Sequence, residues 1–316
     1  MTAITTSTTS TANTAPGPLS PSSSPIPATR AHGNSVTDTL IIAKRNLLRI
    51  LRTPQYLVFS SIQPVMFVLL FRYVFGGAIQ PPGFAGRYAD YLLPGLLVQL
   101  TLFGGAATAV GLSEDMQKGM VDRFRSLPMS RSAVLAGRTF ADIARSFFVL
   151  LLLLAVGSAV GFRFHNGILG GIGAVALTLM VGFAFSWFFA FIGMKVKDPE
   201  TAQVAGFLPI FPLVFAASTF TPIESFPGWL QAFARANPIT NAVNAIRGLT
   251  QGDAPLRRFI ASGERVMPGT DAKKVLATLQ DHANYGRYVI FTLMWCVGLI
   301  AVFATLSIRA YRNSNR

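Results

Sequence analysis

The sequence predicts an all-α membrane protein. The 27 basic and 13 acidic residues together make up only 13% of the 316 residues, where an ordinary soluble domain has roughly 25%. Apolar residues make up 51% and gather in six runs, each long enough to approach or exceed a hydrocarbon core of about 30 Å. This composition argues strongly against a soluble enzyme. The net charge of +14 is interpreted as loop charge beside a membrane, not as a nucleic-acid patch.

Residues 1–34 are predicted to be a disordered cytoplasmic tail. They hold 14 Ser or Thr, five Pro and one charge, so they cannot bury enough apolar surface to offset their chain entropy. A regulatory or docking tail is the alternative. Residues 35–55 are predicted to form an amphipathic helix at the membrane surface, because basic side chains such as Lys44 and Arg49 interleave with leucines up to Pro54. The simpler alternative is that they begin the first transmembrane helix.

Residues 56–316 are predicted to form the transmembrane domain. The expected spans are residues 56–74, 91–110, 143–162, 168–194, 204–220 and 288–308. Gln63-Pro64 is expected to kink the first span, and the long fourth span has room to tilt. Arg72 and Arg145 lie near span ends, where we expect them to snorkel toward the interface. Contact with a substrate is the alternative for each.

The distribution of Lys and Arg predicts that both termini are cytoplasmic. In that orientation 15 of the 27 basic residues lie in cytoplasmic segments, while the short external loops 75–90 and 163–167 carry one each. The external segment 221–287 carries eight, but long segments weigh little in this rule. Asp, Glu and His are missing from the depth of every expected span, which weighs against a proton-coupled carrier.

The loop between the second and third expected spans is the first candidate site. A connection between two helices needs only a few residues, yet this loop has about thirty and is rich in charge. A docking surface is one interpretation, and a solvated hairpin with ordinary positive-inside charge is the other. Its candidate residues are Glu114, Asp115, Gly119, Arg123, Pro128, Arg131, Gly137 and Arg138.

A second motif follows the fifth expected span. Its candidate residues are Pro227, Trp229, Asn237, Pro238, Thr240 and Arg247. Apolar residues from Ile239 onward recur at helical spacing, while Asn244 and Arg247 face elsewhere, so a short helix is expected. Trp229 suits the aromatic belt at a membrane interface.

Taken together, the two motifs resemble those of the membrane subunits of ABC-2 type transporters, and they are closest to the daunorubicin-resistance permease branch. The first reads acidic–x4–Gly–x3–Arg–x4–Pro–x2–Arg–x5–Gly–Arg, and the second reads Pro-x-Trp-Leu, then Asn-Pro-x-Thr, then Arg. The resemblance covers residues 36–316. It implies a permease that binds no ATP itself and works as a dimer on two separate ATP-binding subunits.

The resemblance also implies roles for both motifs. Residues 114–138, with the N-terminal amphipathic helix, would be the coupling surface for the ATPase subunits. The loop around Asp198 would add a second contact or be an ordinary turn. The second motif would form short re-entrant helices that close the pathway externally. The polar stretch 251–287 departs from the family, and it would cover the exit, contact a cell-wall or periplasmic component, or be a tolerated insertion.

The expected function is export of a hydrophobic or amphipathic compound, a drug or lipid, from the bacterial cytoplasm by alternating access. The sequence has no G-x-x-x-x-G-K-[ST] loop, so ATP and Mg²⁺ are expected in a partner chain, with no cofactor or metal in this one. Expected partners are ATPase subunits, a second permease copy or homologue, and membrane lipids, but no nucleic acid. Export of a lipid-linked glycan and ATPase-independent secondary transport are the alternatives.

Overall fold

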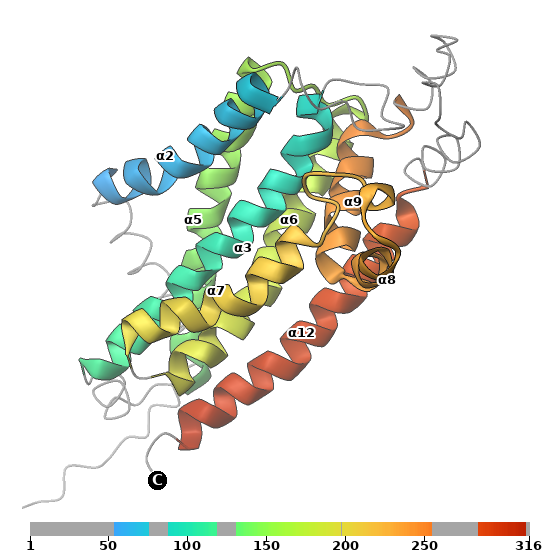
Figure 1. The fold of residues 1–316 in the computed structure, drawn as a ribbon. Helices are drawn as coiled ribbons and strands as arrows, with labels where there is room; N and C mark the ends of the chain where they lie inside the picture. Colours follow the sequence, from blue (N-terminus) through green and yellow to red (C-terminus); the bar gives the residue numbers. More distant parts are fainter. Residues whose placement is uncertain (1–53, 76–87, 119–130, 197, 255–283, 314–316) are drawn as a thin grey trace, which may run out of the picture. The chain divides into compact units, whose positions relative to one another are not determined.

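The described part of the chain is folded into helices (Figure 1). The computed structural model describes residues 54–75, 88–118, 131–196, 198–254 and 284–313. Within these ranges it contains no strand, which confirms the predicted all-α class for them. The predicted tail 1–34 and nearly all of the predicted interfacial helix 35–55 lie outside the described residues.

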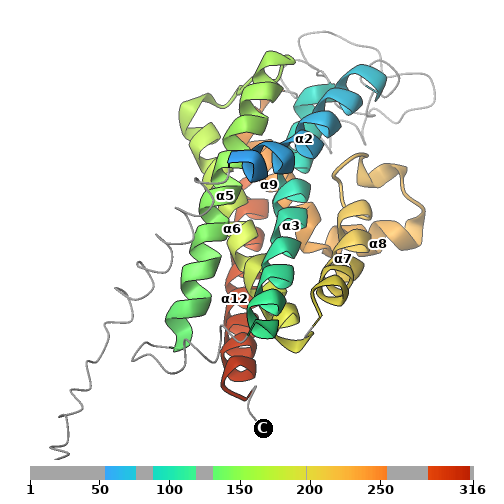
Figure 2. The same ribbon diagram turned by 90° about the vertical axis from the view of Figure 1, so that its left-hand side faces the viewer.

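Each expected span overlaps a helical segment of the structure, although the first covers two elements and the third and fifth run past the ends of their helices. In chain order the helical elements are α2 (Pro54–Leu70), the π-helical η1 (Phe71–Phe75), α3 (Tyr88–Gln117), α5 (Arg131–Ala159), α6 (Gly167–Lys195), α7 (Pro199–Phe215), the 3-10 turn η2 (Ile223–Ser225), α8 (Gly228–Ala236), α9 (Pro238–Gln251) and α12 (Gly286–Asn313). Pro64 lies inside α2, whose ribbon bends along its length (Figure 2). The short helices expected after the fifth span are α8 and α9.

Four stretches of the described residues are long and apolar enough to cross a membrane. They are Tyr88–Gln117, Asp142–Ala159, Gly167–Lys195 and Gly286–Ala310. The apolar stretch Ile62–Val74 is shorter, and α7 has only 17 residues. α7 also ends at Phe215, before the predicted end at residue 220, because the chain turns there toward α8.

The helix α6 is central to the packing. It packs most extensively on α3 and α12, and it also contacts α5, α7 and α9. Figure 2 shows α5 and α7 on opposite sides of α3, and both helices contact it. α9 contacts α3, α6 and α12, so this short helix is enclosed by three of the longest ones.

Of three apolar clusters among the described residues, the two larger hold most of the helices together. One joins α3, α6, α7, α9 and α12 and includes Leu102, Phe189, Ile210 and Val243, and the other joins α2, α3 and α5 and includes Val68, Leu96 and Leu153. In lipid such contacts depend on close packing more than on the hydrophobic effect, so small residues matter. At Gly105 in α3, an added Cβ would lie 2.5 Å from the ring of Phe189 in α6.

Large apolar side chains are exposed on the outer helices. Examples are Met66 on α2, Leu208 on α7 and Met294 on α12, which are 57%, 73% and 63% exposed. Many others accompany them, which is far more exposed apolar surface than soluble monomers carry. Together with the long apolar helices, these faces indicate a multi-pass membrane protein.

Candidate functional site

The Asn-Pro pair of the second motif joins two helices. Asn237 caps α9, because its side-chain oxygen accepts a hydrogen bond from the backbone N–H of Ile239 at 2.9 Å. Its side-chain nitrogen donates to the carbonyl oxygen of Leu213 in the last turn of α7 at 2.6 Å. Pro238 occupies the first helical position, where its missing N–H costs nothing. One amide therefore starts α9 and satisfies a carbonyl at the end of α7.

Arg247 of the same motif is buried. It is 2% exposed, and it is among the largest fully enclosed side chains of the described residues. Its Nε and Nη2 donate to the carbonyl oxygen of Tyr91 in α3 at 3.2 and 3.1 Å. Nη2 also donates to the carbonyl oxygen of Ser218 at 2.9 Å, and Nη1 donates to Oδ1 of Asn244 at 2.7 Å.

Two neighbouring hydroxyls close this group of hydrogen bonds. The Ser218 hydroxyl donates to Oδ1 of Asn244 at 2.9 Å, and the Tyr91 hydroxyl donates to the carbonyl oxygen of Ser218 at 3.3 Å. The planar fork of Arg247 thus ties α9 to α3 and to the turn after α7. We call Tyr91, Ser218, Asn244 and Arg247 the arginine network. Buried polar groups bonded to one another in this way fix a single arrangement of their helices.

The remaining residues of the second motif lie on two different helices or next to them. Thr240 is buried on α9, and its hydroxyl has no hydrogen-bond partner among the described residues. Pro227 precedes α8, and Trp229 stands on α8 with 76% of its surface exposed. The structure therefore places Asn237, Thr240 and Arg247 along α9, where all three are buried, and leaves Trp229 exposed on α8.

The residues of the first motif are described only in part. Glu114 and Asp115 lie in the last turn of α3, where the Glu114 carboxylate accepts a hydrogen bond from the Lys118 ammonium at 3.1 Å. Gly119, Arg123 and Pro128 lie outside the described residues. Arg131, Gly137 and Arg138 lie in the first turns of α5, of which only the backbone is described. Their coupling role stays a prediction.

The snorkelling predicted for Arg145 is wrong. Its side chain is only 8% exposed, and its Nη2 donates to the carbonyl oxygen of Gly104 at 2.5 Å. Because residue 104 has no side chain, the guanidinium can reach the backbone of α3 instead of turning toward an interface. Nearby, Asp142 accepts a hydrogen bond from the Thr108 hydroxyl at 2.7 Å. These two contacts form a polar attachment between α3 and α5.

The loop around Asp198 has a local structural role. Its carboxylate caps α7 by accepting from the backbone N–H of Thr201 at 2.8 Å and from the Thr201 hydroxyl at 2.7 Å. These two hydrogen bonds lower the pKa of Asp198. This geometry is that of the ordinary turn. The second contact with an ATPase subunit stays a prediction.

Two of the partners of Arg247, Tyr91 and Ser218, could not be predicted from the sequence. Asn244 stands three residues before it, and this spacing places both on one helix face, so that pair was within reach. Tyr91 is separated from Arg247 by 156 residues and Ser218 by 29, and no periodicity links them. Among the described residues, no three His, Cys, Asp or Glu side chains gather where they could hold a metal ion.

Comparison with known proteins identifies the family of this chain. The family model for ABC-2 type transporters matches residues 37–250, which include both motifs and the arginine network. The chain is 33% identical over 287 residues to the daunorubicin resistance ABC transporter permease protein DrrB1 of Streptomyces coeruleorubidus. That alignment covers 90% of this chain and 89% of the relative.

More distant relatives carry similar descriptions. The probable doxorubicin resistance ABC transporter permease protein DrrC of Mycobacterium tuberculosis is 25% identical over 71% of this chain and 81% of its own length. The putative transport permease ycf38 of Cyanophora paradoxa is 24% identical over 68% of this chain and 74% of its own length. From the family match and the first of these alignments, the chain belongs to the ABC-2 type transporter family, as a permease similar to the daunorubicin-resistance branch.

Proposed function

We propose that this chain is the membrane subunit of an ATP-binding cassette exporter that moves hydrophobic or amphipathic compounds out of the bacterial cytoplasm. The observation that carries the proposal is the alignment with a daunorubicin resistance permease over nine tenths of both chains. An anthracycline-like drug or a lipid is therefore the proposed cargo. The subunit itself has no ATP site, and two separate ATPase subunits drive alternating access of a permease dimer.

The proposed topology has six spans with both termini in the cytoplasm. Four of the spans would be the long apolar helices. The two shorter spans would be α2 with η1, and α7. In this orientation α8 and α9 lie at the external end and re-enter the membrane there. The exposed Trp229 on α8 suits the outer interface.

The arginine network is the proposed closing element of the external end. It joins α9 to α3 and to the turn after α7 through one enclosed guanidinium. A closed external end resists leakage when the transporter opens inward. Opening would require these hydrogen bonds to break or to move together, which makes the network a two-state element of the kind that alternating access needs.

The first experiment is affinity purification of the tagged chain from its native membrane, followed by identification of co-purifying proteins. We expect an ATP-binding subunit. Both chains are then expressed together in cells loaded with daunorubicin, whose retention is measured by its fluorescence. Lower retention is expected only when both chains are present and the ATPase is intact.

Two outcomes would contradict the proposal. One is drug efflux by this chain alone that a protonophore abolishes, because that describes a secondary transporter. The other is recovery of intact complexes that contain no ATPase under gentle detergent conditions. An ATPase variant without its catalytic carboxylate is the matched control, since it preserves assembly while removing hydrolysis.

A further inference from the structure

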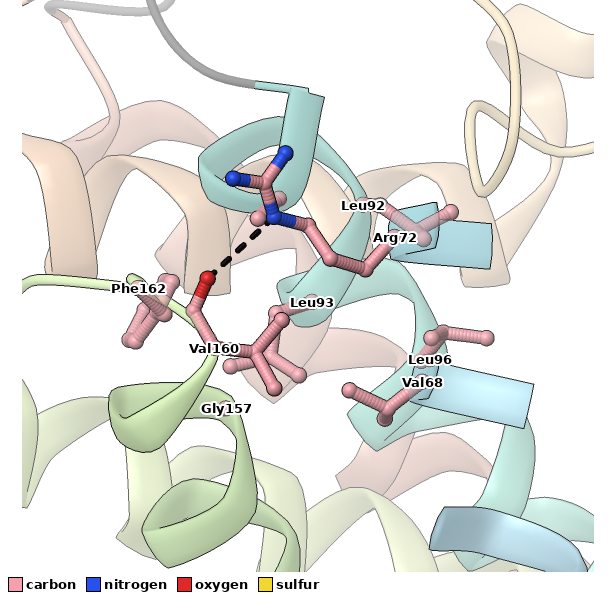
Figure 3. A pocket seen from close by; sticks show the side chains of 9 residues that line it. Val68, Arg72, Leu92, Leu93, Leu96, Gly157, Val160 and Phe162 are labelled. Atoms are coloured by element: carbon pink, nitrogen blue, oxygen red, sulfur yellow. Dashed lines mark hydrogen bonds between the residues drawn. The ribbon is translucent and has the colours of Figure 1, made fainter. Parts of the chain in front are cut away.

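A cleft lies where η1, α3 and the C-terminal end of α5 meet (Figure 3). It is shallow, with an enclosed volume of about 10 Å³, which is the space of a single water molecule. Its walls are apolar and include Val68, Leu92, Leu93, Leu96, Val160 and Phe162. The one charged side chain in the lining is Arg72. The cleft thus combines an apolar interior with a single cation.

Arg72 stands at the edge of this cleft. Its Nε donates to the carbonyl oxygen of Val160 at 3.2 Å, and that carbonyl lies just beyond the end of α5 at Ala159. Carbonyls at a helix C-terminus lack intrahelical donors and attract cations, which explains this bond. Figure 3 shows the other two nitrogens of the guanidinium turned away from Val160. Neither nitrogen has a hydrogen-bond partner among the described residues.

The backbone around Arg72 is itself unusual. Residues Phe71–Phe75 form a π-helical turn, a conformation that is rare and frequent at functional sites. This turn carries Tyr73 and Val74 outward with 75% and 63% of their surfaces exposed. On α5, Leu151 is 47% exposed. The helices that form the cleft therefore present apolar surface to the lipid beside it.

A second cation lies at the same end of α5. Arg163 follows Phe162 of the cleft wall, and its Nη1 donates to the carbonyl oxygens of Ser158 and Phe162 at 2.9 and 3.3 Å. The side chain of Arg163 is otherwise exposed. Two guanidinium groups thus lie beside an apolar cleft near the end of a long apolar helix, and such groups favour the level of lipid headgroups.

We propose that this cleft binds an anionic phospholipid. One acyl chain lies against the exposed apolar side chains beside the cleft, such as Val74. The phosphate accepts hydrogen bonds from the two nitrogens of Arg72 that are not bonded to Val160. Guanidinium groups suit phosphate because they donate two parallel hydrogen bonds to it. Free phosphate would gain nothing from the apolar walls, and a cationic amphiphile would be repelled by Arg72. The inference depends on the membrane setting of these helices and on no particular cargo.

Native mass spectrometry of the full-length chain in detergent tests the proposal. Phosphatidylglycerol and zwitterionic phosphatidylcholine are added in equal amounts, and the lipid retained by the protein is quantified. The wild-type chain should retain phosphatidylglycerol preferentially. Arg72→Gln keeps a donor near Val160 but removes the charge, and it should weaken phosphatidylglycerol binding roughly tenfold, as expected for losing hydrogen bonds to a charged group.

Two further variants separate the headgroup from the chain. Val74→Asn makes the exposed apolar surface beside Arg72 polar while leaving the guanidinium in place, so it should also lower phosphatidylglycerol retention. Arg235→Gln removes a charge from the exposed face of α8, away from the cleft, and should change nothing. An excess of inorganic phosphate should not displace the lipid. Thermal unfolding of each variant shows whether it is folded.

Several results would overturn the lipid site. Equal retention of the two lipids by the wild-type chain would do so whatever the variants show. Unchanged phosphatidylglycerol binding in folded Arg72→Gln would remove the role of the guanidinium. Displacement of the lipid by inorganic phosphate would leave a simple anion site. None of these results bears on daunorubicin efflux, so the transport proposal stands or falls separately.

Discussion

The guanidinium of Arg247 lies over the ring of Tyr91, with its central carbon 3.8 Å from the ring centroid, and also donates to the carbonyl oxygen of the same residue. A single residue of α3 thus receives both a cation–π contact and hydrogen bonds from α9. Displacement of α9 along α3 would weaken both kinds of contact at once. The position of α9 against α3 is therefore closely defined.

Replacing Arg247 should destabilise the protein. Arg247→Ala removes the charged donor from the carbonyl of Ser218 and from the side-chain oxygen of Asn244, and hydrogen bonds to charged groups contribute about 1.5–3 kcal/mol each. We expect a loss of about 2–4 kcal/mol, measured by thermal unfolding in detergent. Arg247→Lys should recover only part of it, because an ammonium lacks the planar fork.

The control for this variant is Arg235→Ala on α8. Arg235 is exposed and donates weakly to Gln231 at 3.5 Å, so its loss should change stability by no more than about 0.5 kcal/mol. If both alanine variants unfold at the same temperature, the arginine network does not stabilise the packing of α9.

Glu114 should matter for coupling and little for stability. Its ion pair with Lys118 is exposed, and such pairs contribute at most about 1 kcal/mol. Under the proposed function, Glu114→Gln should leave the permease inserted and the ATPase active but reduce drug export per ATP hydrolysed. Parallel assays of ATP hydrolysis and daunorubicin efflux measure this ratio.

Lys118→Gln is the matched variant, since it removes the same ion pair by changing its basic partner. Export per ATP should stay near the wild-type value in this variant. An equal defect in both variants would trace the effect to the ion pair, and normal coupling in Glu114→Gln would remove this residue from the docking surface.

Gly95 and Gly298 should respond oppositely to the same substitution. A Cβ at Gly95 in α3 would lie 2.6 Å from the backbone oxygen of Thr219, so Gly95→Ala should cost about 1–3 kcal/mol. A Cβ at Gly298 in α12 would meet no atom within 4 Å. Gly298→Ala should therefore be neutral or stabilise by up to about 1 kcal/mol through its helix propensity. Thermal unfolding of the two variants side by side gives the comparison.

The start of α7 should loosen in acid. Because hydrogen bonds from Thr201 lower the pKa of Asp198 in the folded state, its cap is fully stabilising above the pKa of the unfolded carboxyl. That stabilisation is lost as the pH falls through the lowered folded pKa. Hydrogen exchange at the Thr201 amide, corrected for the intrinsic rate, should report this loss.

In Asp198→Asn the same amide should show no such transition, because an asparagine cap does not titrate. A transition of equal size in both proteins would assign it to another group.

The helices were predictable where the signal is local. Long apolar runs gave every expected span a counterpart, since a hydrocarbon core demands the same pattern wherever a helix crosses it. The N-terminus of α9 was also within reach, because Asn237 and Pro238 are both typical of helix starts.

The contacts between distant residues were not predictable. Asn244 and Arg247 break the apolar pattern of α9 and suggest an exposed polar face, yet both are buried against α3 and the turn after α7. Arg145 likewise has a charge that suggests an interface, but the bare backbone at Gly104 accepts it inside the protein. Helical periodicity shows that a face is polar, whereas the neighbour that meets it depends on tertiary packing.

The double attachment of α9 to the end of α7 and the turn behind it limits how these segments can move. Asn237 bonds to Leu213, and ten residues later Arg247 bonds to Ser218. Along an α-helix the two points are about 15 Å apart. A single contact would let the two segments rotate about it, but two contacts this far apart make α7 and α9 move as one rigid unit. A displacement of α7 would therefore move the whole of α9 with it, with little bending between the two helices.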